Sequence, residues 1–209
     1  MARSTAAKKK TFSSFTYAEA FKHLNLTELN AWDFAATPRQ PSDFFQERLR
    51  RLRISFDLQS QEEAKKLLID AICEEAIVDC QTLKIWKGAP LADELTSGYV
   101  DYVVAERKGY LEAPFVCIIE AKKDDFQQGL AQCLVEMKAC QANNQAIGRN
   151  IDIFGIVTNG QGWQFYCLHT DGNVDATDLY STGNMADLLG RLHALFQRSA
   201  RQIALRAEN

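Results

Sequence analysis

The sequence lacks the features that mark membrane, secreted and multidomain proteins. It contains no apolar run of about 18 residues, so a membrane span is not expected. The first residues, MARSTAAKKKTFSS, lack the apolar core of a secretion signal. Internal repeats and linkers rich in Pro, Gly and Ser are also missing. The 209 residues therefore predict one cytoplasmic domain with a full hydrophobic core and a small appendage.

Histidine is scarce, and cysteine does not follow a metal-binding pattern. The three histidines (His23, His169 and His193) are scattered, and no two of the six cysteines form a CxxC pair. Each cysteine sits among apolar residues, as buried reduced thiols do. We therefore expect inert thiols and no zinc site.

A large excess of positive charge is also absent. There are 24 basic and 27 acidic residues, giving a formal net charge of −3. This balance excludes a protein that attracts nucleic acid through a global positive field. Any DNA binding must use a local basic patch or a metal ion.

Hydrophobic periodicity predicts an α/β protein, of the α+β kind, with a mixed sheet flanked by helices. The expected order is helix, three strands, helix, two strands and helix. The segments are a helix at 61–78, strands at 83–86, 97–107 and 113–123, a helix at 126–143, strands at 151–158 and 163–169, and a helix from about 185. The expected domain limits are a mobile tail at 1–14, an accessory helical region at 15–58 and a main domain at 59–209.

The accessory region contains a cluster of arginines on one expected helix. The segment PSDFFQERLRRLRISF begins with Ser42 or Asp43 as a helix cap. The arginines are Arg48, Arg50, Arg51 and Arg53. They form either a solvated helix face or a surface that contacts phosphate.

The most informative motif is Glu120-Ala121-Lys122. Four Glu-x-Lys triplets occur, at Glu63, Glu106, Glu120 and Glu136. We expect three of them to be ordinary surface, and only the triplet at Glu120 ends an apolar strand, PFVCIIEAKK. Side chains alternate along a strand, so Glu120 and Lys122 should share the face of Val116 and Ile118. Charges on an inner face must be paired, solvated in a cleft or bound to a metal.

Asp101 favours the metal-binding alternative over a simple ion pair at the strand end. It interrupts another apolar strand, YVDYVV, where a carboxylate is a poor strand former. It precedes Glu120 by 19 residues (120 − 101), enough for a turn and an antiparallel return. Two such carboxylates would bind a hard divalent cation, most plausibly Mg²⁺, with Mn²⁺ as a substitute. Lys122 could then position the attacking water and offset phosphate charge.

These segments resemble the PD-(D/E)XK nuclease superfamily, in particular its restriction-endonuclease-like and RecB-like branches. The strand GYVDYVV, the strand FVCIIEAKK and the helix that begins DDFQQGLAQCLVEM carry the resemblance, which covers about residues 62–168. It implies a restriction-endonuclease-like αβββαβ core. It also implies that Asp101 and Glu120 bind Mg²⁺ together with the Ala121 carbonyl, and that Lys122 acts on water. Val100 stands where the family name has proline.

The resemblance also suggests two further residues. Some branches place a glutamine on the helix after the motif strand, and Gln132 matches it as a catalytic residue, unless it is exposed polar filler. Many members place a glutamate on the first helix near the metal. Glu75 shares the apolar face with Leu68 and Ala71, so we prefer it as a metal ligand to Glu63 and Glu74. Alternatively, Glu75 simply reaches solvent at the helix end.

The sequence thus predicts a Mg²⁺-dependent DNA phosphodiesterase, an endonuclease or exonuclease, acting in defence or repair. Cutting both strands of a duplex would favour a homodimer. The alternative is a catalytically inactive subunit that keeps the fold and serves nucleic-acid binding or assembly, which the low net charge favours.

Overall fold

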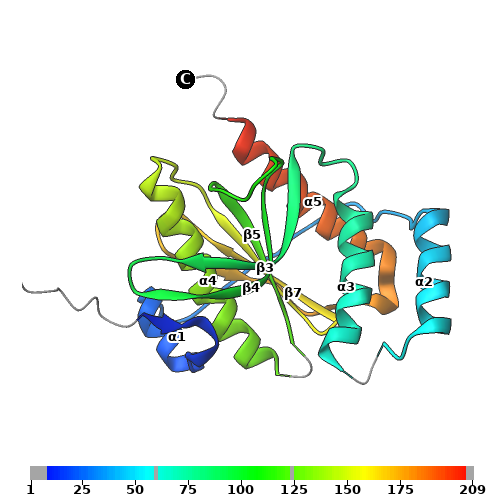
Figure 1. The fold of residues 1–209 in the computed structure, drawn as a ribbon, viewed down its shortest axis with the longest axis horizontal. Coiled ribbons are helices and arrows are strands. Elements are labelled where there is room, and N and C mark those ends of the chain that lie inside the picture. The colour runs from blue at the N-terminus through cyan, green and yellow to red at the C-terminus, as the bar shows by residue number, and fades with distance from the viewer. Residues whose placement is uncertain (1–8, 59–60, 123–124, 206–209) are drawn as a thin grey trace, which may run out of the picture.

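The computed structural model describes residues 9–58, 61–122 and 125–205. A mixed sheet of nine strands forms its centre, with helices on both faces (Figure 1). Within the described residues, no helix is long and apolar enough to cross a membrane. All six cysteines are free and buried, as expected.

The central strands follow the predicted order. β3 (Leu83–Ala92) and β4 (Thr96–Glu106) form an antiparallel hairpin, and β5 (Phe115–Ala121) returns antiparallel to β4. A helical crossover then brings β6 (Ile153–Thr158) parallel to β5, and β7 (Gly162–Leu168) pairs antiparallel with β6. The prediction of a mixed α/β sheet is therefore confirmed.

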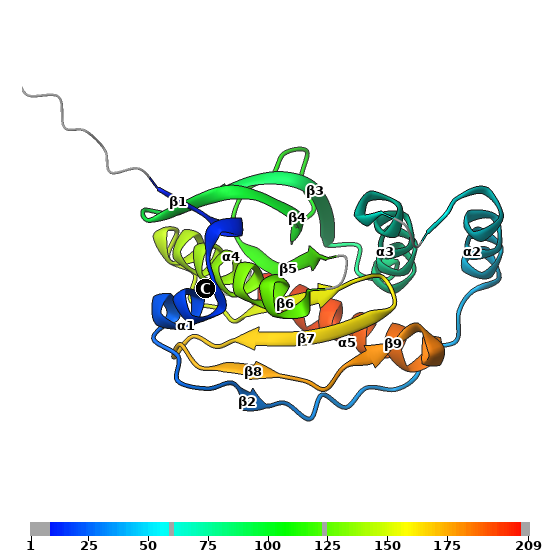
Figure 2. The same ribbon diagram turned by 90° about the horizontal axis from the view of Figure 1, so that it is seen from below.

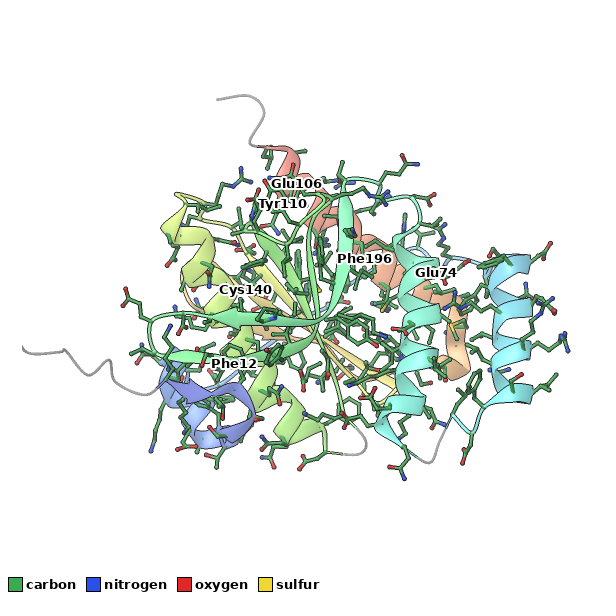
Figure 3. The ribbon with its side chains drawn as sticks, in the orientation of Figure 1. Phe12, Glu74, Glu106, Tyr110, Cys140 and Phe196 are labelled. Carbon is green, nitrogen blue, oxygen red and sulfur yellow. The ribbon has the colours of Figure 1, made fainter. Side chains whose placement is uncertain are left out.

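Two helical layers bury the two faces of this sheet (Figures 1 and 2). α4 (Phe126–Ala146) covers one face together with α1 (Tyr17–Leu24). α3 (Glu62–Ile77) and α5 (Met185–Ala204) pack together on the other, where Phe196 of α5 is fully buried (Figure 3). α2 (Asp43–Ser55) packs outside α3. Two apolar clusters result, one on each side of the sheet.

The N-terminal segment is part of the sheet. β1 (Lys10–Thr11) pairs with β4 and is followed by a short 3-10 helix, η1 (Phe12–Ser14), whose Phe12 is only 1% exposed. β2 (Asn30–Ala31) pairs with β8. The prediction of a mobile tail is wrong for residues 9–14, because β1 pairs with β4 and the Phe12 side chain joins the core. Residues 1–8 and the expected boundary at 59 lie outside the described residues.

Two short strands beyond β7 were missed. β8 (Val174–Ala176) and β9 (Tyr180–Ser181) both pair with β7, and η2 (Thr182–Asn184), a 3-10 helix, leads into α5. β3 is also longer than the four residues predicted. Strands as short as β8 and β9 offer too few residues for alternation to be recognised in the sequence.

A bulge in β5 changes the expected facing of one residue. The β4–β5 register shifts between Val104 and Ala105, which leaves Val116 without a partner. Val116 consequently lies in the apolar cluster on the α3 side, while Ile118 lies in the cluster on the α4 side. The prediction that Val116 and Ile118 share one face is therefore wrong, since an extra residue disrupts alternation.

Candidate active site

Asp101 and Glu120 lie side by side on neighbouring strands. Tyr102 pairs with Ile119, so the antiparallel register continues to Asp101 opposite Glu120. The backbone N–H of Ala121 donates to Oδ2 of Asp101 at 3.0 Å. The spacing of 19 residues thus produces the expected convergence. The Ala121 carbonyl is also expected to bind the metal ion. Ala121 is the last residue of β5 and pairs with Thr158 of β6.

Glu120 is a fully buried carboxylate. Its ion-pair partner is Lys122, whose Nζ lies 2.7 Å from Oε1. Neither oxygen of Glu120 has a hydrogen-bond partner of good geometry among the described residues. Burial, followed by repulsion from Asp101, raises the pKa of Glu120 to about 7 against the attraction of Lys122. A nearby cation would therefore stabilise the ionised form of this carboxylate.

A polar chain connects Lys122 to helix α4. Nζ of Lys122 donates to Oε1 of Gln132 at 3.1 Å, and Nε2 of Gln132 donates to Oε1 of Glu136 at 2.9 Å. Gln132 is only 6% exposed. It is therefore a buried partner of Lys122 and not exposed filler.

Glu136 belongs to the site, although its Glu-x-Lys triplet predicts an ordinary surface residue. It is fully buried, and its Oε2 has no hydrogen-bond partner among the described residues. Burial and the charge of Glu120 raise its pKa well above the ordinary value, although the hydrogen bond from Gln132 opposes this. Its position in the sequence could have identified it, because Glu136 lies one helical turn after Gln132 on the same side of α4.

Helix α3 contributes two further charged groups that were not predicted. Nζ of Lys66 lies 2.9 Å from Oδ1 of Asp101 and also pairs with Glu63 at 2.7 Å. Burial lowers the pKa of Lys66, but hydrogen bonds to Glu63 and Asp101 outweigh it and raise that pKa. The charge of Glu62 acts on both Glu120 and Lys122. Only packing of α3 on the sheet could reveal these contacts.

The proposed metal ligand Glu75 lies elsewhere. Its Oε1 accepts from the backbone N–H of Ser42 at 2.8 Å, and its Oε2 accepts from the Ser42 hydroxyl at 2.9 Å. Glu75 is nine residues beyond Lys66, or about 14 Å along the helix. The expectation that Glu75 is a metal ligand is therefore wrong, because its carboxylate instead holds the start of α2. On α3, Glu62 is a carboxylate whose charge acts on Glu120 and Lys122.

A glycine allows Lys122 to lie against α4. A Cβ on Gly129 would come within 2.9 Å of Cγ of Lys122 and 2.8 Å of a Val157 methyl group. From the other side, the backbone N–H of Lys122 donates to the carbonyl of Thr158 at 2.9 Å. Lys122 is thus fixed at the carboxyl ends of β5 and β6.

A pocket of about 660 Å³ lies next to this edge. Asn159, which follows Thr158, lines it together with Lys65 of α3 and Arg53 of α2. The other arginines of α2 pair with neighbouring carboxylates: Arg48 with Glu74, and Arg50 and Arg51 with Glu47. Those three therefore fit the solvated-face alternative.

The oxygens gathered here suit a hard divalent cation. Asp101 and Glu120 offer carboxylate oxygens, and Glu62 lies close enough to affect Glu120. Oxygen donors of this kind are the ligands that Mg²⁺ takes in proteins. Glu120 is buried beside a second carboxylate with Lys122 as its ion-pair partner, so an additional cation would offset the remaining cost of burying both charges.

Comparison with protein families returns no matching family model. One segment of the chain resembles Crinkler effector protein 5 of Phytophthora infestans, with 48% identity over 55 residues. The match covers 26% of this chain and 15% of that protein. So short a match assigns neither a family nor an activity to the chain.

Proposed function

We propose that this protein is a Mg²⁺-dependent nuclease that hydrolyses phosphodiester bonds of DNA. The observation that supports this most is the buried carboxylate of Glu120, which has no hydrogen-bond partner of good geometry among the described residues and sits beside Asp101 and Lys122. Asp101 and Glu120 would hold the metal ion, with Mn²⁺ as a substitute. The resemblance to PD-(D/E)XK nucleases is consistent with these roles.

Each side chain has a definite task in this proposal. When bound, Mg²⁺ supplies positive charge against the phosphate and activates water for in-line attack. The Ala121 N–H orients Asp101 through Oδ2 and leaves Oδ1 facing Lys66. Lys122 directs its ammonium toward the phosphate and the attacking water. Gln132 holds that ammonium from the side of α4.

The adjacent pocket supports DNA as the substrate. Arg53 and Lys65 line this pocket, which lies near the same strand ends as Lys122. Both groups attract phosphate, and the contact needs no global positive charge. A DNA strand in this pocket would run past the carboxyl ends of β5 and β6.

A second candidate is a binding or assembly subunit without catalysis. It is favoured by the pairing of each carboxylate with a lysine: Lys66 contacts Asp101, and Lys122 contacts Glu120. Such a network can neutralise buried charge without any metal ion.

Lys122→Met distinguishes the two candidates, because methionine keeps the side-chain volume and removes the charge. If Lys122 acts on the phosphate, cleavage of plasmid and linear DNA in Mg²⁺ should fall by about 10²–10³-fold. Metal binding should persist, since lysine is not a ligand for Mg²⁺. Asp101→Asn should instead weaken Mg²⁺ binding, measured by titration calorimetry.

The matched control is Lys108→Met. Lys108 also belongs to a Glu-x-Lys triplet and pairs with Glu106 and Glu112, far from the motif strand's end. Its loss should leave cleavage unchanged. If Lys122 only neutralises Glu120, Lys122→Met should cost about 3–5 kcal/mol of stability. Wild-type protein that neither binds Mg²⁺ nor cuts DNA would reject the nuclease and favour the binding subunit.

A further inference from the structure

A second group of metal-ligating side chains lies at the other end of the central strands, away from the proposed nuclease site. Asp152 precedes β6, Cys167 is near the end of β7, and His169 follows β7. Nδ1 of the histidine, Sγ of the cysteine and a carboxylate oxygen of the aspartate all lie within 4.8 Å of one another. The cysteine and histidine pattern of the sequence predicts no zinc site, and this grouping is an observation against that prediction.

We propose that Asp152, Cys167 and His169 bind one Zn²⁺ ion. Nδ1 of His169 lies 3.7 Å from Sγ of Cys167 and 3.5 Å from Oδ2 of Asp152. Tetrahedral zinc, with bonds of about 2.3 Å to sulfur and about 2.0–2.1 Å to nitrogen and oxygen, separates these donor pairs by about 3.6 and 3.4 Å. Nδ1 of His169 is therefore spaced from both other donors as in a tetrahedral zinc site, and those two donors lie within 4.8 Å of one another.

The histidine is oriented as metal-bound histidines are. Its other ring nitrogen, Nε2, lies 2.8 Å from Oδ2 of Asp175 on β8. Asp175 is in turn held by Asn30 of β2, whose Nδ2 donates to Oδ1 at 3.2 Å. A carboxylate on the outer nitrogen fixes the tautomer that presents Nδ1 to a metal. Asp175 is thus a positioning residue and not a ligand.

The aspartate is also fixed, and the site is reachable. Oδ1 of Asp152 accepts from the backbone N–H of Thr170 at 3.0 Å, which leaves Oδ2 toward His169. The side chains of Asp152 and His169 are 36% and 34% exposed, whereas Cys167 is buried. An ion can enter from the solvent side, and solvent completes its fourth position.

The set of donors selects a borderline-soft ion. Thiolate and imidazole favour Zn²⁺, while Mg²⁺ takes oxygen ligands. Burial and the charges of Asp152 and Asp175 raise the pKa of the free Cys167 thiol. A bound Zn²⁺ deprotonates its thiol ligand, so binding releases a proton and is weaker at low pH.

This site is independent of the proposed nuclease site. β5 and β6 are parallel, and Glu120 pairs with Val157 near the end of β6. Asp152 lies five residues earlier (157 − 152), or about 17 Å along the strand. The zinc ion would join the start of β6 to the β7–β8 hairpin, so we expect a structural effect.

Cobalt substitution tests the proposal on the full chain. Co²⁺ replaces Zn²⁺ and gives a near-ultraviolet absorption band only when a thiolate is a ligand. Wild type should bind one Co²⁺ with this band, Zn²⁺ should displace it, and Zn²⁺ should raise the melting temperature. Asp175→Asn should weaken affinity about 10–100-fold.

Cys167→Ser and His169→Ala should each lose the band, with circular dichroism checking that both variants fold. Cys80→Ser is the matched control, since Cys80 is also a buried free cysteine. It should keep the band, as should Glu120→Gln at the other site. No stoichiometric binding by wild type, or a band that survives Cys167→Ser, would overturn the proposal; His169 would then simply bridge Asp152 and Asp175.

Discussion

At the residue scale, the site is decided by the cost of burying two carboxylates together. Glu120 and Glu136 are both fully buried, and the charge of Glu120 raises the pKa of Glu136. Lys122 and Gln132 lie between them and supply partial compensation. Repulsion between the two carboxylates lowers the stability of the metal-free protein. A bound cation would restore that stability.

The pKa of Glu120 predicts how stability depends on pH. Because its folded pKa is about 7 and its ordinary value 4.5, the folded state binds more protons between these values. Its favourable contribution is complete below about pH 4.5 and is lost as the pH rises through 7, by roughly 3 kcal/mol. Urea melts of the metal-free protein from pH 5 to 8 should show this loss.

Glu120→Gln should remove most of that loss, because glutamine does not titrate. Glu63→Gln is the control: Glu63 is exposed, and its hydrogen bond from Lys66 lowers its pKa. It should leave the loss at rising pH in place. An unchanged pH profile in Glu120→Gln would refute the assigned titration.

At the scale of elements, β5 and α4 meet where Gly129 leaves room. The helix approaches the carboxyl ends of β5 and β6 so closely that a Cβ on Gly129 would collide with both Lys122 and Val157 of β6. This close contact sets the position of the lysine. The sequence shows the glycine but cannot show what it faces.

Gly129→Ala should therefore destabilise the protein by about 1–3 kcal/mol, despite the better helix propensity of alanine. Urea melts provide the measurement. Gly109→Ala is the comparison, since a Cβ on Gly109 meets nothing within 4 Å. We expect that change to stay within about 0.5 kcal/mol. Equal stability of the two variants would show that α4 can move away at no cost.

At the scale of the whole molecule, the N-terminal segment completes the sheet. Phe12 packs under β4, where a Cβ on Gly98 would touch its ring at 2.8 Å. Phe12 is almost fully buried and lies beside the hairpin that carries Asp101 (Figure 3). Packing of Phe12 thus stabilises the sheet that carries Asp101 and Glu120.

Phe12→Ala should cost about 3–5 kcal/mol in urea unfolding. Phe44→Ala is the matched change on α2, where the ring is 66% exposed, and should cost no more than about 0.5 kcal/mol. A cost for Phe12→Ala that equals the cost for Phe44→Ala would restore the earlier interpretation of residues 9–14 as a mobile tail.

The sequence alone determined the order of the core elements and the convergence of Asp101, Glu120 and Lys122. Alternation and spacing are local properties, and an antiparallel return of known length fixes which residues meet. Gln132, by contrast, was suggested by the resemblance to PD-(D/E)XK nucleases and not by alternation or spacing. Alternation failed for Val116, because one bulge reverses the facing of a strand residue.

Only the tertiary structure decided the remaining contacts. Lys66 reaches Asp101, Glu75 binds Ser42, and His169 meets Asp152 through packing between distant segments. Hydrophobic periodicity indicates which side of a helix is apolar. It does not indicate where along a neighbouring helix or strand that helix packs. A helix shifted by one turn exchanges one carboxylate for another, so the identity of such neighbours depends on the packed core as a whole.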